Sequence, residues 1–226
     1  MLIRFFDVVF SGIALVALSP LLIPAMLLLK FSGEGEVFFL QERIGKNREM
    51  FKLYKFATML KNSPSTGTGT VTMKNDPRVL PVGIFLRKSK INELPQLLNV
   101  FLGHMSLIGP RPQTPRCFNV FSAKSQGIIV KVKPGLSGIG PIVFRGEENI
   151  LEGHSGTLDF YDNIIGPYKG DVEAWYVGNQ KPRVYFSLIL LTVWVVVFPK
   201  SDVIWKIFRD LPIPPDELKS ELNYSI

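Results

Sequence analysis

Residues 90–112, KINELPQLLNVFLGHMSLIGPRP, contain side chains of the types that bind phosphate and metal ions. Pro95 fits the first turn of a helix, because the N–H group that proline lacks has no helical partner there. Four apolar residues at helical spacing predict this helix: Leu94, Leu97, Leu98 and Phe101. The register places Asn92 close to the N-cap and Glu93 in the first turn. Free N–H groups and the positive end of the helix dipole favour an anion at that point.

Glu93 has two interpretations that the residues alone leave open. In the plain one, Asn92 caps the helix and the Glu93 carboxylate only compensates the helix dipole. In the other, Glu93 ligates Mg²⁺ and arginines hold the oxygens of a phosphate ester. Arg87 lies five residues before Asn92, and Arg111 lies 18 residues after Glu93, between two prolines. This spacing does not show by itself that the side chains meet.

The composition limits the classes of function. The 226 residues carry a net charge of +7, which suits an anionic partner such as a phosphorylated substrate or a membrane surface. Hydrophobic residues make up 46% of the chain, which is high for a soluble protein of this size. Cys117 is the only cysteine, so neither an intrachain disulfide nor a cysteine-based metal cluster can form. The basic residues are scattered without an aromatic stacking motif, which argues against nucleic-acid binding.

The apolar N-terminal segment, residues 1–31, has the length of a membrane helix. Residues 8–29 are 22 uncharged residues, and as an ideal helix they would extend roughly 33 Å. Ser19, Pro20 and Pro24 interrupt the apolar run, and an interior proline kinks a helix. Two shapes compete: a kinked helix that spans the membrane, and a helix–break–helix that returns to the same leaflet. The residues alone favour the spanning helix.

Charged residues flank this segment. We expect Arg4 and Asp7 to pair at the membrane surface, where they would anchor the helix rather than take part in chemistry. The stretch from residue 30 to residue 61 is basic, and the positive-inside rule therefore places it in the cytoplasm.

Residues 36–61 predict a β-hairpin of two short strands that passes into a helix, with IGKNREMF as the turn. Toward the C-terminus, residues 184–198 are 15 uncharged residues, which is short for a membrane span and favours a buried or membrane-lying helix. Ser201 can cap a further helix with one apolar face. Trp205 and basic residues flank that face, as in helices at a lipid interface. An ordinary packed helix explains the same pattern equally well.

Several motifs along the chain recur together in one protein family: RFFD and SP in the first segment, VFFLQERIG, YKFATM, NDPRVLPVGIFLRKSKINELPQLLNVFLGHMSLIGPRP and VKPGLSGIG. In these motifs the chain resembles the bacterial sugar transferase family, the small monotopic phosphoglycosyl transferases. The resemblance covers nearly the whole chain. The long central block is highly specific, because ELPQL followed by SLIGPRP at this spacing is hard to reach by chance.

The resemblance implies an enzyme at the cytoplasmic face of the bacterial inner membrane. It would transfer a sugar 1-phosphate from a UDP-sugar to undecaprenyl phosphate, release UMP, use Mg²⁺, and start a surface glycan such as an exopolysaccharide, capsule or O-antigen. The implied fold is α+β, mainly α, with interfacial amphipathic helices and a compact cytoplasmic catalytic domain that carries a small β-hairpin. The resemblance also implies that Ser19-Pro20 breaks a re-entrant membrane helix, in place of the spanning helix favoured above.

The family has an Asp-Glu dyad before LPQL, and Asn92 stands here in place of the aspartate. In the family the aspartate attacks the phosphate next to the sugar, and the glutamate helps to hold Mg²⁺. An amide is a poor nucleophile, so three explanations are open. Glu93 is the nucleophile, with the Asn92 carbonyl oxygen on the metal; or the lipid phosphate attacks the UDP-sugar directly; or the protein is inactive, by nature or through a deliberate Asp→Asn change.

The resemblance extends to other polar positions. Lys55 matches the lysine of a KFRTM-like pattern, and Arg145 matches an arginine after the PGLSG-like loop. Glu173 lies where the family has an acidic residue before YV. The expected substrate-binding residues are therefore Lys55, Arg87, Arg111, Arg145 and Glu173.

The expected layout has three parts: a membrane helix in residues 1–31, a cytoplasmic catalytic domain in residues 32–183, and membrane-associated or interfacial helices in residues 184–226. The expected partners are a UDP-sugar, undecaprenyl phosphate and membrane lipids. Two alternatives remain, a non-catalytic membrane-interface scaffold of the same fold and a glycosyl transferase that releases UDP. The sequence does not identify the sugar, and a homodimer is compatible with it.

Overall fold

The computed structural model describes residues 2–66, 76–152 and 157–225. The chain packs into two compact units, each described here by itself. The N-terminal unit comprises Phe5–Glu42 and Lys52–Gly103, and the C-terminal unit comprises Met1–Arg4, Arg43–Phe51 and His104–Ile226. The predicted limits at residues 31 and 183 concern membrane contact rather than packing, and they stay a prediction.

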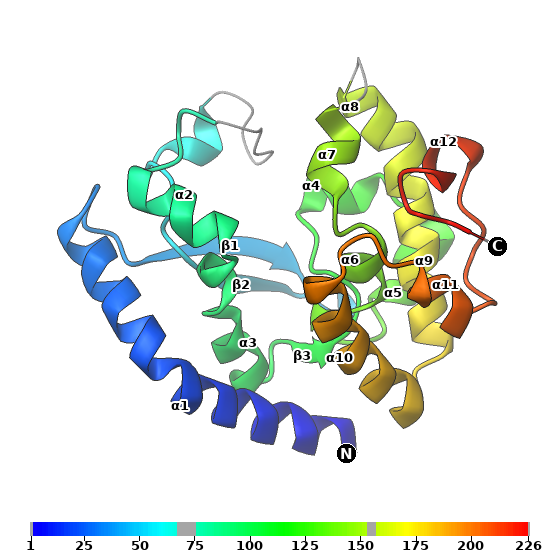
Figure 1. The fold of residues 1–226 in the computed structure, drawn as a ribbon, viewed down its shortest axis with the longest axis horizontal. Helices are drawn as coiled ribbons and strands as arrows, with labels where there is room; N and C mark the ends of the chain where they lie inside the picture. The colour runs from blue at the N-terminus through cyan, green and yellow to red at the C-terminus, as the bar shows by residue number, and fades with distance from the viewer. Residues whose placement is uncertain (1, 67–75, 153–156, 226) are drawn as a thin grey trace. The chain divides into compact units, whose positions relative to one another are not determined.

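Helix α1, Leu2–Phe31, keeps both interior prolines within one continuous helix (Figure 1). The interruption that we expected at Ser19-Pro20 is absent. Pro20 has no N–H group to donate to the carbonyl of Val16, four residues earlier, and the hydroxyl of Ser19 donates to that carbonyl at 2.7 Å instead. The bond that the proline removes is thus replaced from the neighbouring residue. Re-entry of the helix into one leaflet stays a prediction.

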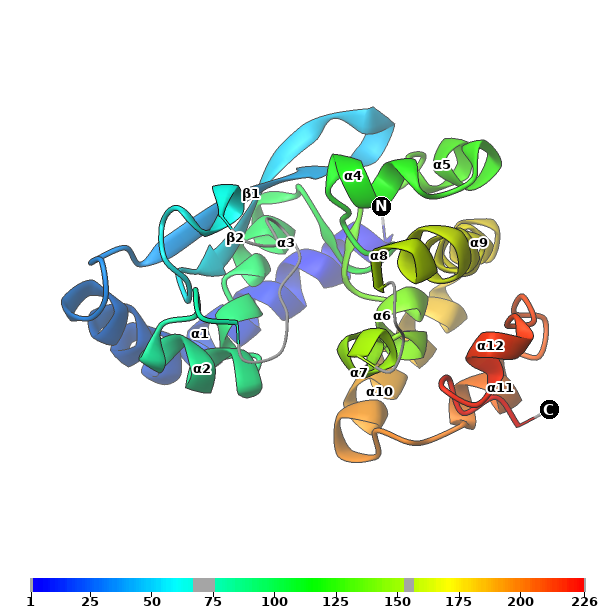
Figure 2. The ribbon, with the colours of Figure 1, turned by 90° about the horizontal axis from the view of Figure 1, so that it is seen from above.

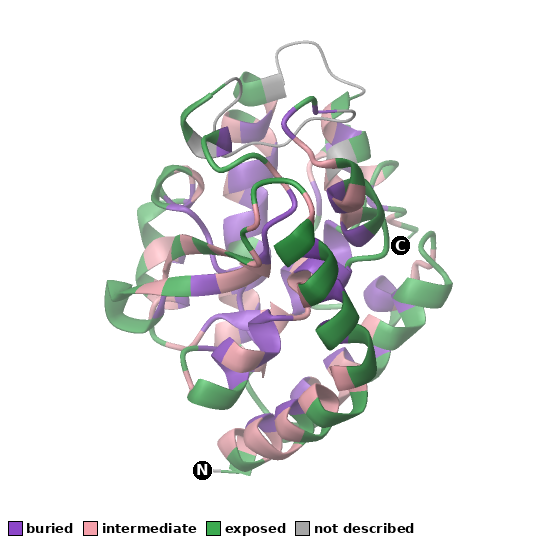
Figure 3. Ribbon diagram, turned by 90° about the vertical axis from the view of Figure 1, so that its left-hand side faces the viewer, coloured by how far each residue is buried: buried purple, intermediate pink, exposed green. Residues whose placement is uncertain are grey.

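One side of α1 packs on the N-terminal unit, and its other sides are exposed. The buried residues follow a single stripe along the helix: Asp7, Ser11, Leu22, Ala25 and Leu29. The exposed sides carry large apolar residues, among them Phe5, Ile13, Val16, Leu21, Leu28 and Phe31. Figure 3 shows how buried and exposed residues alternate along the helices. By length and composition, α1 is apolar enough to cross a membrane.

The predicted hairpin forms, and its residues outside Arg43–Phe51 belong to the N-terminal unit together with four short helical elements. The helix predicted after the hairpin does not form at residues 57–60. The strands are β1, Phe38–Ile44, and β2, Met50–Phe56, joined through the 3₁₀ turn η1, Lys46–Arg48. After the 3₁₀ turn η2, Ser63–Ser65, come α2, Pro81–Lys88, η3, Ile91–Glu93, and α3, Gln96–Leu102. Leu22, Ala25 and Leu29 of α1 share one hydrophobic core with Phe56, Leu86 and Ile91. This core fixes β2 and η3 against α1.

The C-terminal unit is built around helix α9, Gly166–Gly178, which packs against α5, Ala123–Ile129, and α6, Ile139–Val143 (Figure 1, Figure 2). Strand β3, Ser106–Ile108, pairs in parallel with β4, Gly135–Ser137. The other helical elements are α4, Pro115–Asn119, α7, Glu147–Glu152, α8, Thr157–Phe160, the π-helix η4, Tyr161–Ile165, and α10, Pro182–Val197. The predicted α+β fold, mainly α, with a small hairpin is confirmed.

The C-terminal segment packs more deeply than an interfacial helix would. Helix α11 is short, Val203–Ile207, and α12 spans Asp216–Lys219. Trp205 was expected to flank an apolar face, but it is 1% exposed and its indole N–H donates to the carbonyl of Leu222 at 3.1 Å. The residues after α11 fold back over it and enclose the ring. Of the two interpretations, the packed helix therefore describes the inner face of α11.

Candidate active site

The N-terminal unit brings Lys55 and Glu93 together. Lys55 is near the end of β2, and Glu93 is the last residue of η3. The ammonium Nζ lies 3.2 Å from carboxylate Oε1, and the two side chains are 18% and 26% exposed. The pair is partly open to solvent, so a phosphate or a metal ion can approach it. A pairing between a predicted substrate ligand and the predicted metal ligand supports a shared site.

Asn92 does not cap the helix as predicted. It lies in η3, which begins after Lys90, a residue with left-handed backbone angles (φ 59°). The N–H groups of Glu93 and Leu94 bond back to the carbonyls of Lys90 and Ile91 at 3.1 Å, so the 3₁₀ turn uses them. Helix α3 begins only at Gln96. The sequence pattern predicted helix α3 correctly but placed its first turn too early. A separate 3₁₀ turn, η3, occupies the residues expected to form that first turn.

The side chain of Asn92 is buried, with 6% of the residue exposed. Its Oδ1 has no hydrogen-bond partner among the described residues. An unpaired buried acceptor costs roughly 1–3 kcal/mol. The oxygen is therefore one that a nearby cation or hydrogen-bond donor would satisfy.

The donor set of this turn fits Mg²⁺ held together with a diphosphate. Among the described residues, no group of three or more His, Cys, Asp or Glu side chains could hold a metal ion alone. Mg²⁺ needs no such cage, because it keeps several waters and is commonly held by one or two carboxylates and substrate phosphates. Glu93 can supply the carboxylate, and the unpaired oxygen of Asn92 can supply a second donor.

Arg87 belongs to the same unit, in the last turn of α2, which packs against η3. Its Nη1 lies 3.7 Å from Sδ of Met59, which is a weak contact. Only Ser89 and Lys90 separate helix α2 from the turn that carries Glu93. Lys55, Arg87, Asn92 and Glu93 thus lie on adjoining elements of one unit.

Arg111 and Glu173 meet in the C-terminal unit. The backbone N–H of Arg111 donates to Oε1 of Glu173 at 2.9 Å. Glu173 lies on α9 and is completely buried. Burial raises the pKa of its carboxyl group to about 7, although the Arg111 N–H and the charge of Lys169 favour the ionised form. Such an enclosed carboxylate holds the backbone of Arg111 in place, and this burial gives no support to the substrate contact that the resemblance implies for Glu173.

Two further features hold the segment that carries Arg111. The hydroxyl of Tyr176, one turn after Glu173 on α9, donates to the carbonyl of Ile108 at 3.2 Å. A Cβ atom on Gly140 would clash with Oε1 of Glu173, so a larger residue at this position would displace the carboxylate. The GPRP turn is therefore fixed by α9 from below and by the parallel pairing of β3 with β4.

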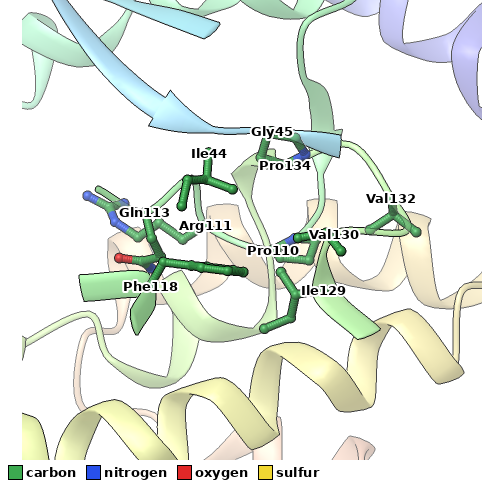
Figure 4. Close-up of a pocket in the computed structure, with 10 residues that line it drawn as sticks. All are labelled: Ile44, Gly45, Pro110, Arg111, Gln113, Phe118, Ile129, Val130, Val132 and Pro134. Carbon is green, nitrogen blue, oxygen red and sulfur yellow. The ribbon is translucent and has the colours of Figure 1, made fainter. Parts of the chain in front are cut away.

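Arg111 also lines a pocket of the C-terminal unit. Figure 4 shows Arg111 and Gln113 near Phe118 in this pocket. Apolar residues such as Pro110 and Ile129 line the rest of it. The Nε2 atom of Gln113 is buried without a hydrogen-bond partner among the described residues. Polar groups thus gather at one end of the pocket, beside Arg111.

Arg145 follows α6 and is exposed at the surface of the C-terminal unit. The structure places Arg111, Arg145 and Glu173 in this unit and the other predicted site residues in the N-terminal unit. A single site formed by both sets stays a prediction. The pairing of Arg4 with Asp7 also stays a prediction. Asp7 itself is buried, with 2% of the residue exposed.

Sequence reasoning missed Asn99. It is completely buried and bonds to the backbone of β2 on both sides of Leu53. A signal was present, because Asn99 is a polar residue within the apolar run LLNVFL, where helical spacing points it toward the core.

Comparison with known proteins places these residues in a family. The family model described as bacterial sugar transferase matches residues 1–199. The exopolysaccharide production protein ExoY of Sinorhizobium fredii is 38% identical over 158 residues, which cover 64% of this chain and 70% of that protein. The UDP-glucose:undecaprenyl-phosphate glucose-1-phosphate transferase of Escherichia coli is 37% identical over 157 residues, which cover 68% of this chain.

A third relative acts on a different sugar by its name. The UDP-N-acetylgalactosamine-undecaprenyl-phosphate N-acetylgalactosaminephosphotransferase of Aeromonas hydrophila is 39% identical over 142 residues, or 62% of this chain. The matched region covers only 33% of that protein and 34% of the Escherichia coli enzyme. The chain thus spans about a third of these two longer relatives.

Proposed function

We propose that this chain, which belongs to the bacterial sugar transferase family, transfers a sugar 1-phosphate from a UDP-sugar to undecaprenyl phosphate and releases UMP. The product, an undecaprenyl diphosphate sugar, would start the assembly of a surface glycan. The observation that carries the proposal is the Lys55–Glu93 pair, which sets an ammonium group 3.2 Å from the carboxylate at the first residue of ELPQL. Mg²⁺ bound at Glu93 would neutralise charge on the diphosphate.

The reaction breaks the bond between the phosphorus that bears the sugar and the oxygen that leaves with UMP. A new bond forms from that phosphorus to an oxygen of the lipid phosphate. The protein's part in such a transfer is mainly positioning and charge stabilisation. We assign these roles to Lys55 and Arg87 of the N-terminal unit. Phosphate binding by Arg111 and Arg145 stays a prediction from the family resemblance.

The position of the attacking group distinguishes two routes. Asn92 cannot attack phosphorus as the family's aspartate does, because its amide is a poor nucleophile. Either Glu93 attacks and forms a covalent phosphosugar intermediate, or the lipid phosphate attacks directly. Intact-protein mass after incubation with a UDP-sugar and Mg²⁺ separates the two, since only the Glu93 route adds the mass of a sugar phosphate.

The assay for the function uses purified full-length protein, Mg²⁺, undecaprenyl phosphate and a panel of UDP-sugars. Release of UMP supports the proposal, and release of UDP would indicate an ordinary glycosyl transferase. Neither product across the panel would favour a non-catalytic scaffold, the alternative that Asn92 supports. Glu93→Gln should abolish UMP release, while Glu217→Gln, at an exposed position of α12, is the matched control and should keep it.

We further propose that the protein is monotopic at the cytoplasmic face of the bacterial inner membrane. The N-terminal unit contacts α1 from Gly12, which faces Phe101, to Leu29 in the core. This distance is about 26 Å of helix. A helix perpendicular to the membrane would carry the attached unit, with Lys55 and Glu93, into the hydrocarbon layer, where charges are costly. An α1 that lies in or dips into one leaflet avoids this.

Helix α10 offers a second lipid-facing surface. Tyr185, Leu188, Leu191 and Val195 are buried on its inner side. Its outer side exposes Leu190, Val193, Trp194, Val197 and Phe198 at helical spacing. We assign this outer side to the membrane interface, because exposed Lys200 follows it and would meet the lipid headgroups.

The location of α1 has a direct test. Cysteines placed at Leu2 and Ser32, in a Cys117→Ser background, should both react with an impermeant maleimide in inside-out membrane vesicles. Neither should react in right-side-out vesicles. Reaction of the two cysteines from opposite sides would show a spanning helix instead.

A further inference from the structure

Asn99 forms two hydrogen bonds to strand β2 from inside the N-terminal unit. Its Oδ1 accepts from the backbone N–H of Tyr54 at 2.9 Å, and its Nδ2 donates to the carbonyl of Lys52 at 2.8 Å. The orientation of the amide is unambiguous, because the N–H can only donate and the carbonyl can only accept. The residue is completely buried, so water does not compete for these bonds.

This pattern imitates a neighbouring strand. In a parallel ladder, one residue bonds to the carbonyl before and the N–H after the residue opposite it. The Asn99 amide makes this pair of bonds around Leu53, which is 2% exposed. A helix side chain thus holds β2 at a single point, in addition to the pairing of β2 with β1.

Asn99 holds the backbone of β2 directly beside Lys55. Lys55 follows Tyr54 directly, and Glu93 is six residues before Asn99 in the same chain segment. Backbone bonds from Leu94 to Ile91 and from Leu97 to Leu94 make this segment a continuous turn. One rigid segment therefore holds β2 through Asn99 and presents Glu93 to Lys55 at 3.2 Å.

We propose that Asn99 is a positioning residue for the Lys55–Glu93 pair. Removing its amide takes away the partner that Asn99 offers to the Tyr54 N–H and the Lys52 carbonyl, and the strand end that carries Lys55 loses its attachment to α3. The effect of Asn99 on sugar-phosphate transfer rests on the proposed function. The effect of Asn99 on the geometry of the Lys55–Glu93 ion pair is independent of the proposed function. The effect on transfer and the effect on geometry can therefore be measured separately.

The geometry is tested by the rate at which an amine-reactive reagent labels Lys55 in the full-length protein, read by peptide mass spectrometry. Exposed Lys88 in the same unit is the internal reference. Asn99→Ala should raise the Lys55 rate several-fold without changing the Lys88 rate. Glu93→Gln should raise it to a similar extent, and the double variant should add nothing, because both changes abolish the same pair.

An unchanged Lys55 rate in Asn99→Ala, or additive increases in the double variant, would overturn the proposal. A general loosening of the unit would raise the Lys88 rate as well and would also count against it. If Asn99→Ala does not fold, Asn99→Asp replaces it, since aspartate keeps the acceptor for Tyr54 but loses the donor to Lys52. Asn119→Ala, at an exposed position, is the matched control and should change neither rate.

The activity test compares how much Asn99→Ala lowers kcat/KM in the wild-type protein and in the Lys55→Met variant. A positioning role predicts that Asn99→Ala lowers kcat/KM strongly in the wild-type background and little in the Lys55→Met background. An equal loss in both backgrounds overturns the proposal. Coupled labelling in a protein that transfers nothing would refute the proposed function while leaving the positioning role supported.

Discussion

Replacing Glu173 with glutamine should make the stability of the protein depend less on pH. Burial raises the pKa of the Glu173 carboxyl group from its ordinary value of 4.5 to about 7, and the Arg111 N–H, the Gly140 N–H and the charge of Lys169 oppose this rise. In the unfolded chain the same carboxyl group is solvated and titrates near its ordinary value. Between these two values the folded protein therefore binds more protons than the unfolded chain.

The sign and size of the effect follow from proton linkage. Because the folded state binds more protons, the free energy of unfolding falls as the pH rises from about 4.5 to about 7, and the full penalty is present above 7. One pKa unit corresponds to about 1.4 kcal/mol, so the rise of the Glu173 pKa to about 7 is worth on the order of 3 kcal/mol. Glutamine does not titrate and can still accept the Arg111 N–H. Relative to the wild type, Glu173→Gln should therefore gain this amount between pH 4 and pH 8.

The measurement is denaturant unfolding of both proteins in the same detergent at several pH values. The difference between variant and wild type is the quantity to plot, because the titration of all other groups cancels in it. Glu217→Gln, at an exposed position, should give a flat line. A flat line for Glu173→Gln as well, or a difference that falls as the pH rises, would refute the reasoning, because either result shows that folding does not raise the pKa of Glu173.

Three further predictions concern the site, α1 and α10. Lys55→Met should lower the rate of UMP release by roughly 10- to 100-fold, because a hydrogen bond to a charged group is worth about 1.5–3 kcal/mol; an unchanged rate would remove Lys55 from the site. Ser19→Ala should lower the free energy of unfolding in detergent by about 1 kcal/mol, because it leaves the Val16 carbonyl without its donor. Lipids brominated near the headgroup should quench the tryptophan fluorescence of the wild type, and Trp194→Phe should remove most of this quenching, whereas Trp205→Phe should not. Equal quenching in Trp194→Phe would place α10 away from lipid.

Periodicity was sufficient to predict the regular elements but not their ends. The apolar run of α1, the hairpin and the helix after ELPQL are visible in the sequence because each has a simple pattern of apolar residues. The true start of α3 is not visible in the sequence. It depends on left-handed backbone angles at Lys90, which only the surrounding structure can enforce. The continuity of α1 was missed for a similar local reason, since the rule that proline breaks a helix takes no account of the hydroxyl of Ser19.

The candidate site was predictable in residue type but not in role. Glu93 could be named from its place at the start of an apolar helix pattern, and Lys55 from the family resemblance. Glu173 and Asn99 look alike in the sequence, as polar residues on helices, and burial alone separates them from surface residues. Burial arises from contacts between distant segments, such as α9 with the Arg111 turn, and a single sequence does not contain these distances.

Asn92 changes the charge of the turn without changing its size. With a neutral amide at this position, Lys55 and Glu93 form a pair of zero net charge, whereas an aspartate would add a second carboxylate at a residue that is only 6% exposed. A buried unpaired carboxylate costs far more than a buried unpaired amide. The amide therefore favours the resting turn, but it also removes the nucleophile of the covalent route. Activity in such a protein would depend on how accurately the cations are placed around the diphosphate, which is the task that the structure gives to Asn99.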